Sequence, residues 1–130
     1  MNSMEKESNF DEELFFSALA DRTRLRLINL LRDGEVCVCF FAGTLGTHNP
    51  KISRHLAYLK RAGLVTARRD GKWMHYKLSR PSNKLAGEIF DATLKMLAAD
   101  REMIEDRRQL EKECCSPSAP VMIKGRARAT

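Results

Sequence analysis

The sequence contains no apolar run that approaches the roughly 20 residues needed to cross a bilayer, so a transmembrane helix is not expected. Its first residues, MNSMEKESNFDEE, are acidic and polar, which does not fit a secretory signal. From these two absences we expect a cytoplasmic protein without a membrane partner. With 130 residues, of which 43% are hydrophobic and 31% charged, the chain can form one globular domain with a modest core.

Motifs of catalysis are also missing. The chain has no phosphate-binding loop, no cluster of acidic and basic catalytic side chains, and no room for a separate substrate domain. Histidine is scarce, and the three histidines, His48, His55 and His75, all lie in one basic segment. We therefore expect a protein that is not an enzyme and has no catalytic cofactor.

Acidic residues are almost absent from residues 48–80. This segment holds nine lysines or arginines and one acid, Asp70, so it carries a formal charge of +8, whereas the whole chain carries +6. All of the positive excess therefore lies here, as expected of a surface that contacts DNA phosphates. The alternative is a solvated basic face on an ordinary domain, which the layout of the segment disfavours.

The same segment has the pattern of a short helix followed by a hairpin. Asn49 can cap a helix that begins with Pro50 and runs to about residue 62, and Gly63 suits its C-terminal cap. Its apolar face is formed by Ile52, Leu56 and Leu59. Two β-prone runs, 64–68 and 73–78, are joined by a turn that contains Asp-Gly. This order predicts a mainly α winged helix-turn-helix with a β-hairpin wing.

The N-terminal half supplies the other helices of the domain. We expect helices over residues 10–18 and 22–32, with Asp21 capping the second and its arginines facing outward. The later part of residues 35–46 is predicted to be the first helix of the helix-turn-helix. Residues 1–8 are expected to be disordered, residues 9–113 to form the DNA-binding and dimerisation domain, and residues 114–130 to form a flexible tail that begins with two cysteines.

Residues 84–113 have the pattern of one long helix, about 40 Å in length at 1.5 Å per residue. Its apolar stripe, interrupted only by Asp106, consists of Leu85, Ile89, Ala92, Met96, Ala99, Met103 and Leu110. A stripe of this length exceeds what a small domain can cover, so we predict that it pairs with a second copy of the chain. The alternative is a helix that packs only within its own chain.

The four cysteines form two pairs, and in a cytoplasmic protein they should be reduced thiols. Cys37 and Cys39 would point about 200° apart in a regular helix, so they can hold one ion only where the chain is extended or unwound. The nearby helix start favours thiolates, although such a pair can also simply be buried. Cys114 and Cys115, at a charged helix end, are poor core residues but can be a tolerated tail pair. Four thiols without a carboxylate or histidine cluster suit a thiophilic ion.

Four segments occur in the order and at the spacing of a known family: ALADRTRLRLINLL, GEVCVCFF, PKISRHLAYLKRAGLV and RRDGKWMHYKLS. Over about residues 14–79 the chain resembles the ArsR/SmtB family of metalloregulatory repressors, and within it the arsenic-responsive branch. The resemblance implies a homodimeric winged helix whose terminal helices form the interface. It also implies a repressor that binds double-stranded operator DNA and is released by a metal or metalloid ion.

The resemblance implies which residues meet the DNA. Side chains of the 50–62 helix would enter the major groove, and the wing would reach the minor groove or its phosphates. The residues expected to contact DNA are His48, Asn49, Lys51, Ser53, Arg54, His55, Tyr58, Arg69 and Lys72.

The implied ion site matches the family only in part. The best-known arsenic sensors carry C-x-C-x-x-C, and here Cys37 and Cys39 match the first two positions whereas the third is Ala42. Trivalent arsenic in this family prefers three thiolates, so Cys114 or Cys115 would supply the third, from the same subunit or from the other. The alternatives are a site at the tail pair alone, or two separate sites.

These observations predict a repressor that leaves its operator when trivalent arsenic, as arsenite or antimonite, binds cysteine thiolates. One alternative is a repressor of the same family that responds to Cd(II) or Pb(II), for which four thiolates would also serve. Another is a repressor whose cysteine pairs respond to oxidation. The lack of a His/Asp cluster on residues 84–113 argues against the zinc-responsive type, and an arsenate reductase has little support.

Overall fold

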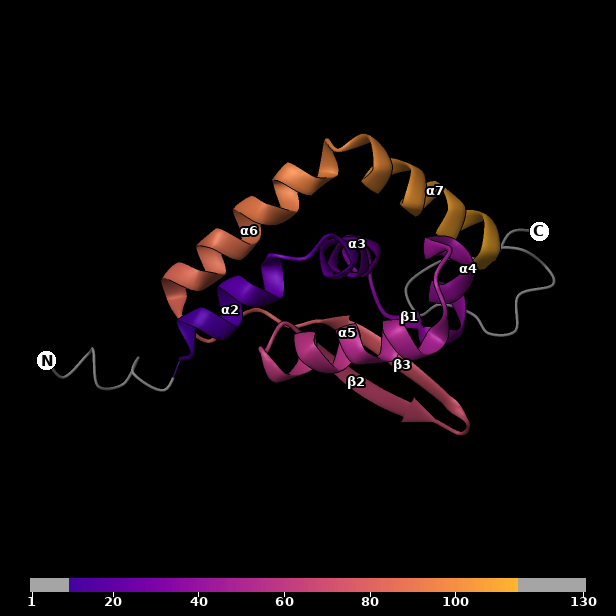
Figure 1. Ribbon diagram of the computed structural model, residues 1–130, viewed down its shortest axis with the longest axis horizontal. Coiled ribbons are helices and arrows are strands. Elements are labelled where there is room, and N and C mark those ends of the chain that lie inside the picture. The colour runs from indigo at the N-terminus through magenta and orange to yellow at the C-terminus, as the bar shows by residue number, and fades with distance from the viewer. Residues whose placement is uncertain (1–9, 115–130) are drawn as a thin grey trace, which may run out of the picture.

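The computed structural model describes residues 10–114, which form a layered domain of helices with a small sheet (Figure 1). The predicted disordered N-terminus and all of the tail beyond Cys114 lie outside the described residues. The elements in chain order are α2 (Glu12–Leu19), α3 (Arg22–Leu30), β1 (Val36–Cys37), the 3₁₀ helix η1 (Val38–Phe40), α4 (Phe41–Leu45), α5 (Asn49–Arg61), β2 (Val65–Asp70), β3 (Trp73–Leu78), α6 (Lys84–Ala98) and α7 (Arg101–Cys114).

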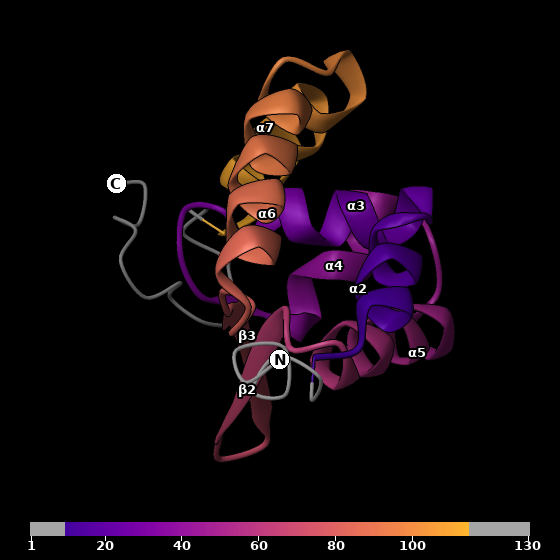
Figure 2. The same cartoon turned by 90° about the vertical axis from the view of Figure 1, so that its left-hand side faces the viewer.

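The order of elements is that of a winged helix-turn-helix, as predicted. Helices α4 and α5 form the helix-turn-helix, and strands β2 and β3 form the wing. Figure 1 shows α6 and α7 as an arch above α3, and Figure 2 shows α5 and the hairpin together on the opposite side. None of the described helices is long and apolar enough to cross a membrane.

The turn between α4 and α5 depends on glycine. Gly46 ends α4 with φ +68°, a left-handed conformation that costs glycine little because it has no Cβ. The prediction that Asn49 caps α5 is wrong by one residue: His48 is the N-cap, and its Nδ1 accepts a hydrogen bond from the Lys51 amide at 3.3 Å. Pro50 therefore lies within the first turn, where the amide it lacks has no intrahelical partner.

The sheet has a third strand that the sequence pattern did not reveal. Its order is β1-β3-β2 and both pairings are antiparallel, so wing strand β3 is the central strand and lies between β2 and the short strand β1. Cys37 of β1 is paired with His75 of β3, and His75 is paired in turn with Arg68 of β2. Cys37 is therefore part of the same sheet as the wing, and Cys39 follows it in η1.

One hydrophobic cluster joins the helix-turn-helix to the rest of the domain. Leu45 of α4 and Ile52 and Leu56 of α5 are all buried in it, as expected from the sequence. The largest fully buried side chains include Phe15 of α2 and Phe41 of α4. Because these residues pack in one core, α4 and α5 can be displaced only together with their neighbours.

The prediction of one continuous helix over residues 84–113 is wrong. The chain breaks after α6, and Asp100 begins α7 by accepting a hydrogen bond from the Met103 amide at 3.2 Å. Met103 and Leu110, which were assigned to a seam between two chains, are fully buried within their own chain. The break folds α7 back over α3, so only the α6 part of the stripe is left on the surface.

Of the α3 arginines, Arg22 is exposed as predicted, whereas Arg24 and Arg26 are partly buried. Arg26 binds Asp106 of α7 through two hydrogen bonds of 2.7 and 2.9 Å, and Arg22 pairs with Asp100 and Glu102 at 2.8 Å each. Asp106, which interrupts the apolar stripe, is buried. Its role is to bind Arg26 within the same chain. Charged residues thus join α3 to α7 beside the apolar core.

An apolar surface remains on α2 and α6. Its large exposed side chains are Phe16, Leu85, Ile89 and Met96, with exposed fractions of 52%, 66%, 40% and 67%. Three of them come from the stripe that predicted a dimer interface. Exposed apolar residues grouped on neighbouring helices are typical of a protein contact surface.

Candidate DNA interface and thiol site

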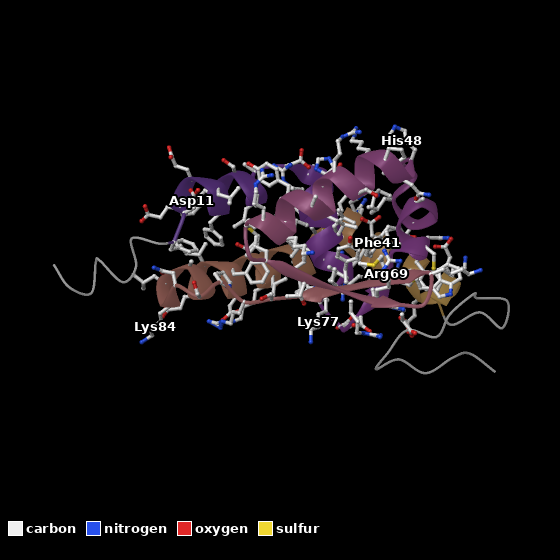
Figure 3. The ribbon with its side chains drawn as sticks, turned by 90° about the horizontal axis from the view of Figure 1, so that it is seen from below. Asp11, Phe41, His48, Arg69, Lys77 and Lys84 are labelled. Carbon is white, nitrogen blue, oxygen red and sulfur yellow. The ribbon has the colours of Figure 1, made fainter. Side chains whose placement is uncertain are left out.

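The side of the domain that carries α5 and the wing presents a row of polar and basic side chains. Figure 3 shows this side, with His48 at the start of α5 and Arg69 on the hairpin. The predicted DNA-contact residues that are exposed here are His48, Asn49, Lys51, Ser53, Arg54, Arg69 and Lys72. Their exposure leaves them free to contact a ligand that approaches this side.

The other two predicted contact residues, His55 and Tyr58, are partly buried against α3. Arg24 of α3 lies 4.2 Å from the centre of the Tyr58 ring, and Arg61 of α5 lies 4.8 Å from it. The same Arg24 guanidinium is 3.2 Å from His55 Nδ1. It also donates to the carbonyl oxygens of Ala18 and Ser17, at 3.0 and 2.7 Å. Arg24 therefore holds α5 against the end of α2.

The environment of His55 favours its neutral form by lowering its pKa. Burial lowers the pKa of His55, and the positive charge of Arg24 lowers it further, although Asp21 at 3.9 Å opposes this. This cluster was not predicted, because the sequence pattern does not distinguish Arg24 from the other arginines of the same short helix, which were expected to face solvent.

The wing is tied to the segment before β1 by an ion pair. Arg68 donates to both carboxylate oxygens of Glu35, at 3.0 and 2.6 Å, in the bidentate geometry that strengthens such pairs. Glu35 is buried, and it lies two residues before Cys37. Periodicity could not reveal this contact, since the two residues are 33 positions apart in the chain.

Cys37 and Cys39 lie side by side, as a shared site requires. Cys37 is in β1 and Cys39 in η1, so the chain is not a regular α-helix here, which is the condition stated above for a shared site. The Cys39 thiol donates a hydrogen bond to Cys37 Sγ, with the two sulfurs 2.9 Å apart. Two thiolates on a tetrahedral ion with bonds of about 2.3 Å are about 3.8 Å apart. An ion that binds both sulfurs would therefore widen the pair.

The Cys39 thiol of this pair favours the protonated form. Burial, together with the neighbouring Cys37 thiol, raises the pKa of Cys39 to about 12. The positive end of the following helix, which was expected to favour a thiolate, is outweighed at this position. A ligand that binds the Cys39 sulfur must therefore displace its proton.

Two sulfurs do not complete a site for an ion that prefers three. Within residues 10–114 no group of three or more His, Cys, Asp or Glu side chains is gathered for a metal ion. Cys114 is the last residue of α7, and Cys115 lies outside the described residues. Helix α7 contacts both η1 and α4, with Cα atoms within 8 Å, and its last turn is bonded to α4, which begins directly after η1.

Comparisons with known proteins agree with this architecture. Residues 21–67 match the family described as bacterial regulatory protein, arsR family. The arsenical resistance operon repressor of Escherichia coli K12 is 41% identical over 103 residues, which cover 78% of this chain and 86% of that protein. The arsenic resistance transcriptional regulator ArsR1 of Pseudomonas putida is 39% identical, covering 83% and 84%.

Solved structures of transcription regulators have the same fold. The transcriptional repressor BigR from Xylella fastidiosa superposes with a TM-score of 0.58 at 29% identity, covering 77% of this chain and 95% of that one. A homodimeric winged helix-turn-helix DNA-binding domain from Mycobacterium bovis superposes with a TM-score of 0.53 at 31% identity, covering 66% and 76%. Family and fold are those of DNA-binding transcriptional regulators.

Proposed function

The chain belongs to the ArsR family of bacterial regulatory proteins, and we propose that it is a cytoplasmic repressor that binds operator DNA as a homodimer and is released by trivalent arsenic. The observation that carries the inducer part of the proposal is the Cys37–Cys39 pair. Its sulfurs are 2.9 Å apart and lie directly before the first helix of the helix-turn-helix. Arsenite and antimonite are thiophilic species that such a pair can bind.

DNA binding is supported by charge and exposure on the α5 side of the domain. Lys51 and Arg54 are exposed on α5, and Arg69 and Lys72 are exposed on the wing. We assign α5 to the major groove, and the wing to the minor groove or the adjacent phosphates. Basic residues on both elements would contact the backbone on either side of the bases that α5 reads.

A homodimer is supported by the apolar surface on α2 and α6. Leu85 and Met96 are each about two-thirds exposed, which is costly for large apolar side chains unless a partner covers them. A two-fold dimer would place two copies of α5 in half-sites about one DNA turn apart. A small change in the separation of the two helices would then lose several phosphate contacts.

The inducer would act on the DNA-binding side through elements that contact the thiols directly. We infer that the ion widens the Cys37–Cys39 pair and recruits a third thiol from Cys114 or Cys115. Widening displaces β1, which pairs with wing strand β3, and α4, which shares a core with α5. The ion would not need to draw the two cysteines together, because their sulfurs are already in contact. The result is lower affinity for DNA, a coupling between two sites.

The test is a titration of the reduced protein on a DNA duplex that the wild type has enriched from a random-sequence library. Fluorescence anisotropy reports release by arsenite, antimonite, Cd(II), Pb(II) or Zn(II), for the wild type, Cys37→Ser and the double variant Cys114→Ser/Cys115→Ser. The proposal expects release by arsenite or antimonite that both variants lose. Release by Cd(II) or Pb(II) alone would favour the second candidate, a sensor of those ions with four thiolates. Release by peroxide alone would indicate a redox sensor.

A further inference from the structure

The last turn of α7 is fixed on the helix-turn-helix by the side chain of Glu113. Thr44 of α4 donates a hydrogen bond from its hydroxyl to Glu113 Oε2 at 2.7 Å. Figure 1 shows the end of α7 lying against α4. A hydrogen bond between a hydroxyl and a carboxylate is among the stronger kinds, because the acceptor is charged.

The neighbouring residue of α4 makes room for this contact. A Cβ atom on Gly43 would lie 2.7 Å from Glu113 Oε1, closer than real Cβ contacts, so a larger residue would displace the carboxylate. Gly43 has no backbone conformation that requires glycine, since it is absent from the described glycines with positive φ. A Cβ here would therefore shift the Glu113 carboxylate from the position in which it binds Thr44.

The rest of α7 is anchored in the same chain. Asn29 of α3 donates to the Met103 carbonyl oxygen at 2.9 Å in the buried interior, and Arg26 binds Asp106 at 2.7 and 2.9 Å. Met103 and Leu110 are fully buried. Helix α7 therefore packs onto its own subunit along most of its length, and Glu113 fixes the turn that ends at Cys114.

We propose that Glu113 is a positioning residue for the inducer site, holding Cys114 beside η1 so that one subunit supplies all the thiols of its own site. This inference rests on the proposed function. Glu113 holds the last turn of α7 on α4, and α4 begins directly after η1, which contains Cys39, so the elements that carry Cys39 and Cys114 are neighbours. Because Thr44 lies in α4, a pull on Cys114 by the ion would also reach the first helix of the helix-turn-helix through Glu113.

The first test decides which subunit supplies the thiols. A mixed dimer is purified with two affinity tags, one subunit carrying Cys37→Ser/Cys39→Ser and the other Cys114→Ser/Cys115→Ser. Bound arsenic per dimer is then measured by mass spectrometry after arsenite loading and desalting. Sites within one subunit predict two arsenic atoms in the wild type and none in the mixed dimer or in either parent homodimer. One arsenic atom in the mixed dimer, with none in the parents, would overturn the inference and leave the proposed function intact.

The second test isolates Glu113. Residues that orient metal ligands typically change metal affinity about 10–100-fold when they are replaced. We expect Glu113→Ala to weaken arsenite binding about tenfold or more, and Glu113→Gln, which keeps an acceptor for Thr44, to restore most of it. Lys112→Ala, on an exposed neighbour in the same helix, is the matched control.

DNA affinity without arsenite separates positioning from folding. It should be unchanged for Lys112→Ala and close to unchanged for Glu113→Gln, which keeps the acceptor for Thr44. Equal arsenite affinity for Glu113→Ala and Lys112→Ala would refute the positioning role. If the wild type binds no arsenite at all, the proposed inducer is wrong. That result differs from the outcomes that would refute the single-subunit site or the role of Glu113.

Discussion

Replacement of Asp106 by alanine should destabilise the domain far more than replacement of its neighbour Glu105. Asp106 is 7% exposed and accepts both hydrogen bonds from Arg26, which is 20% exposed. Removing one partner of a buried pair costs about 3–5 kcal/mol. Glu102, 3.8 Å from Arg26, and the partial exposure of Arg26 reduce this to about 2–3 kcal/mol for Asp106→Ala.

The matched control lies one residue away on the same helix. Glu105 forms an ion pair with Arg108 at 3.3 Å, but both side chains are at least 70% exposed. Exposed pairs contribute about 0–1 kcal/mol, so Glu105→Ala should cost little. For a domain of this size, about 2–3 kcal/mol corresponds to a fall in the melting temperature of about 8–15 °C.

The assay is calorimetry or circular dichroism at one protein concentration, because the stability of a dimer depends on concentration. The double variant Arg26→Met/Asp106→Leu should recover most of the loss, since it leaves no unpaired charge. Equal melting temperatures for Asp106→Ala and Glu105→Ala would show that this pair does not hold α7 on α3. The same result would count against the proposal that the packing of α7 on its own chain positions Cys114 at the thiol site.

Three further perturbations have defined outcomes. Acidification from pH 7.5 to 5.5 should lower the free energy of unfolding, since the lowered pKa of His55 makes the unfolded chain bind more protons in this range; His55→Gln should flatten the profile. Arg24→Lys keeps the charge but loses the planar contacts with Tyr58 and two carbonyl oxygens, and should cost about 2 kcal/mol in denaturant unfolding. A much smaller loss of unfolding free energy would show that the core holds α5 in place without the contacts of Arg24. Lys72→Ala should reduce the slope of log affinity for DNA against log salt by about 0.9 per phosphate, or about 1.8 per dimer; an unchanged slope would exclude a phosphate contact there.

The sequence allowed the order of elements and the DNA-facing side to be predicted because both follow from local patterns. Glycine and Asp-Gly positions mark the turns, and the spacing of Ile52, Leu56 and Leu59 defines the buried face of α5. The wing and α5 were therefore located to within one or two residues. The boundary error at Asn49 arose because His48, which is not among the residue types preferred at N-caps, caps α5 through its Nδ1.

Local patterns could not predict contacts between residues that are far apart in the sequence. A heptad-like stripe cannot distinguish a dimer seam from packing on another helix of the same chain, and at Met103 and Leu110 the second is found. Asp100, which breaks the stripe by capping α7, was visible in the sequence but was not recognised as a cap. The proximity of Cys37 and Cys39 depended on a strand, β1, whose two residues form no recognisable pattern.

The measurement that tests the central claim most directly is a linkage experiment on the wild-type protein. The dissociation constant of the enriched DNA duplex is measured without arsenite and with saturating arsenite, and that of arsenite is measured with and without DNA. The account predicts that arsenite weakens DNA binding and that DNA weakens arsenite binding by the same factor, as linkage requires. Unchanged DNA affinity at full arsenite occupancy would contradict it.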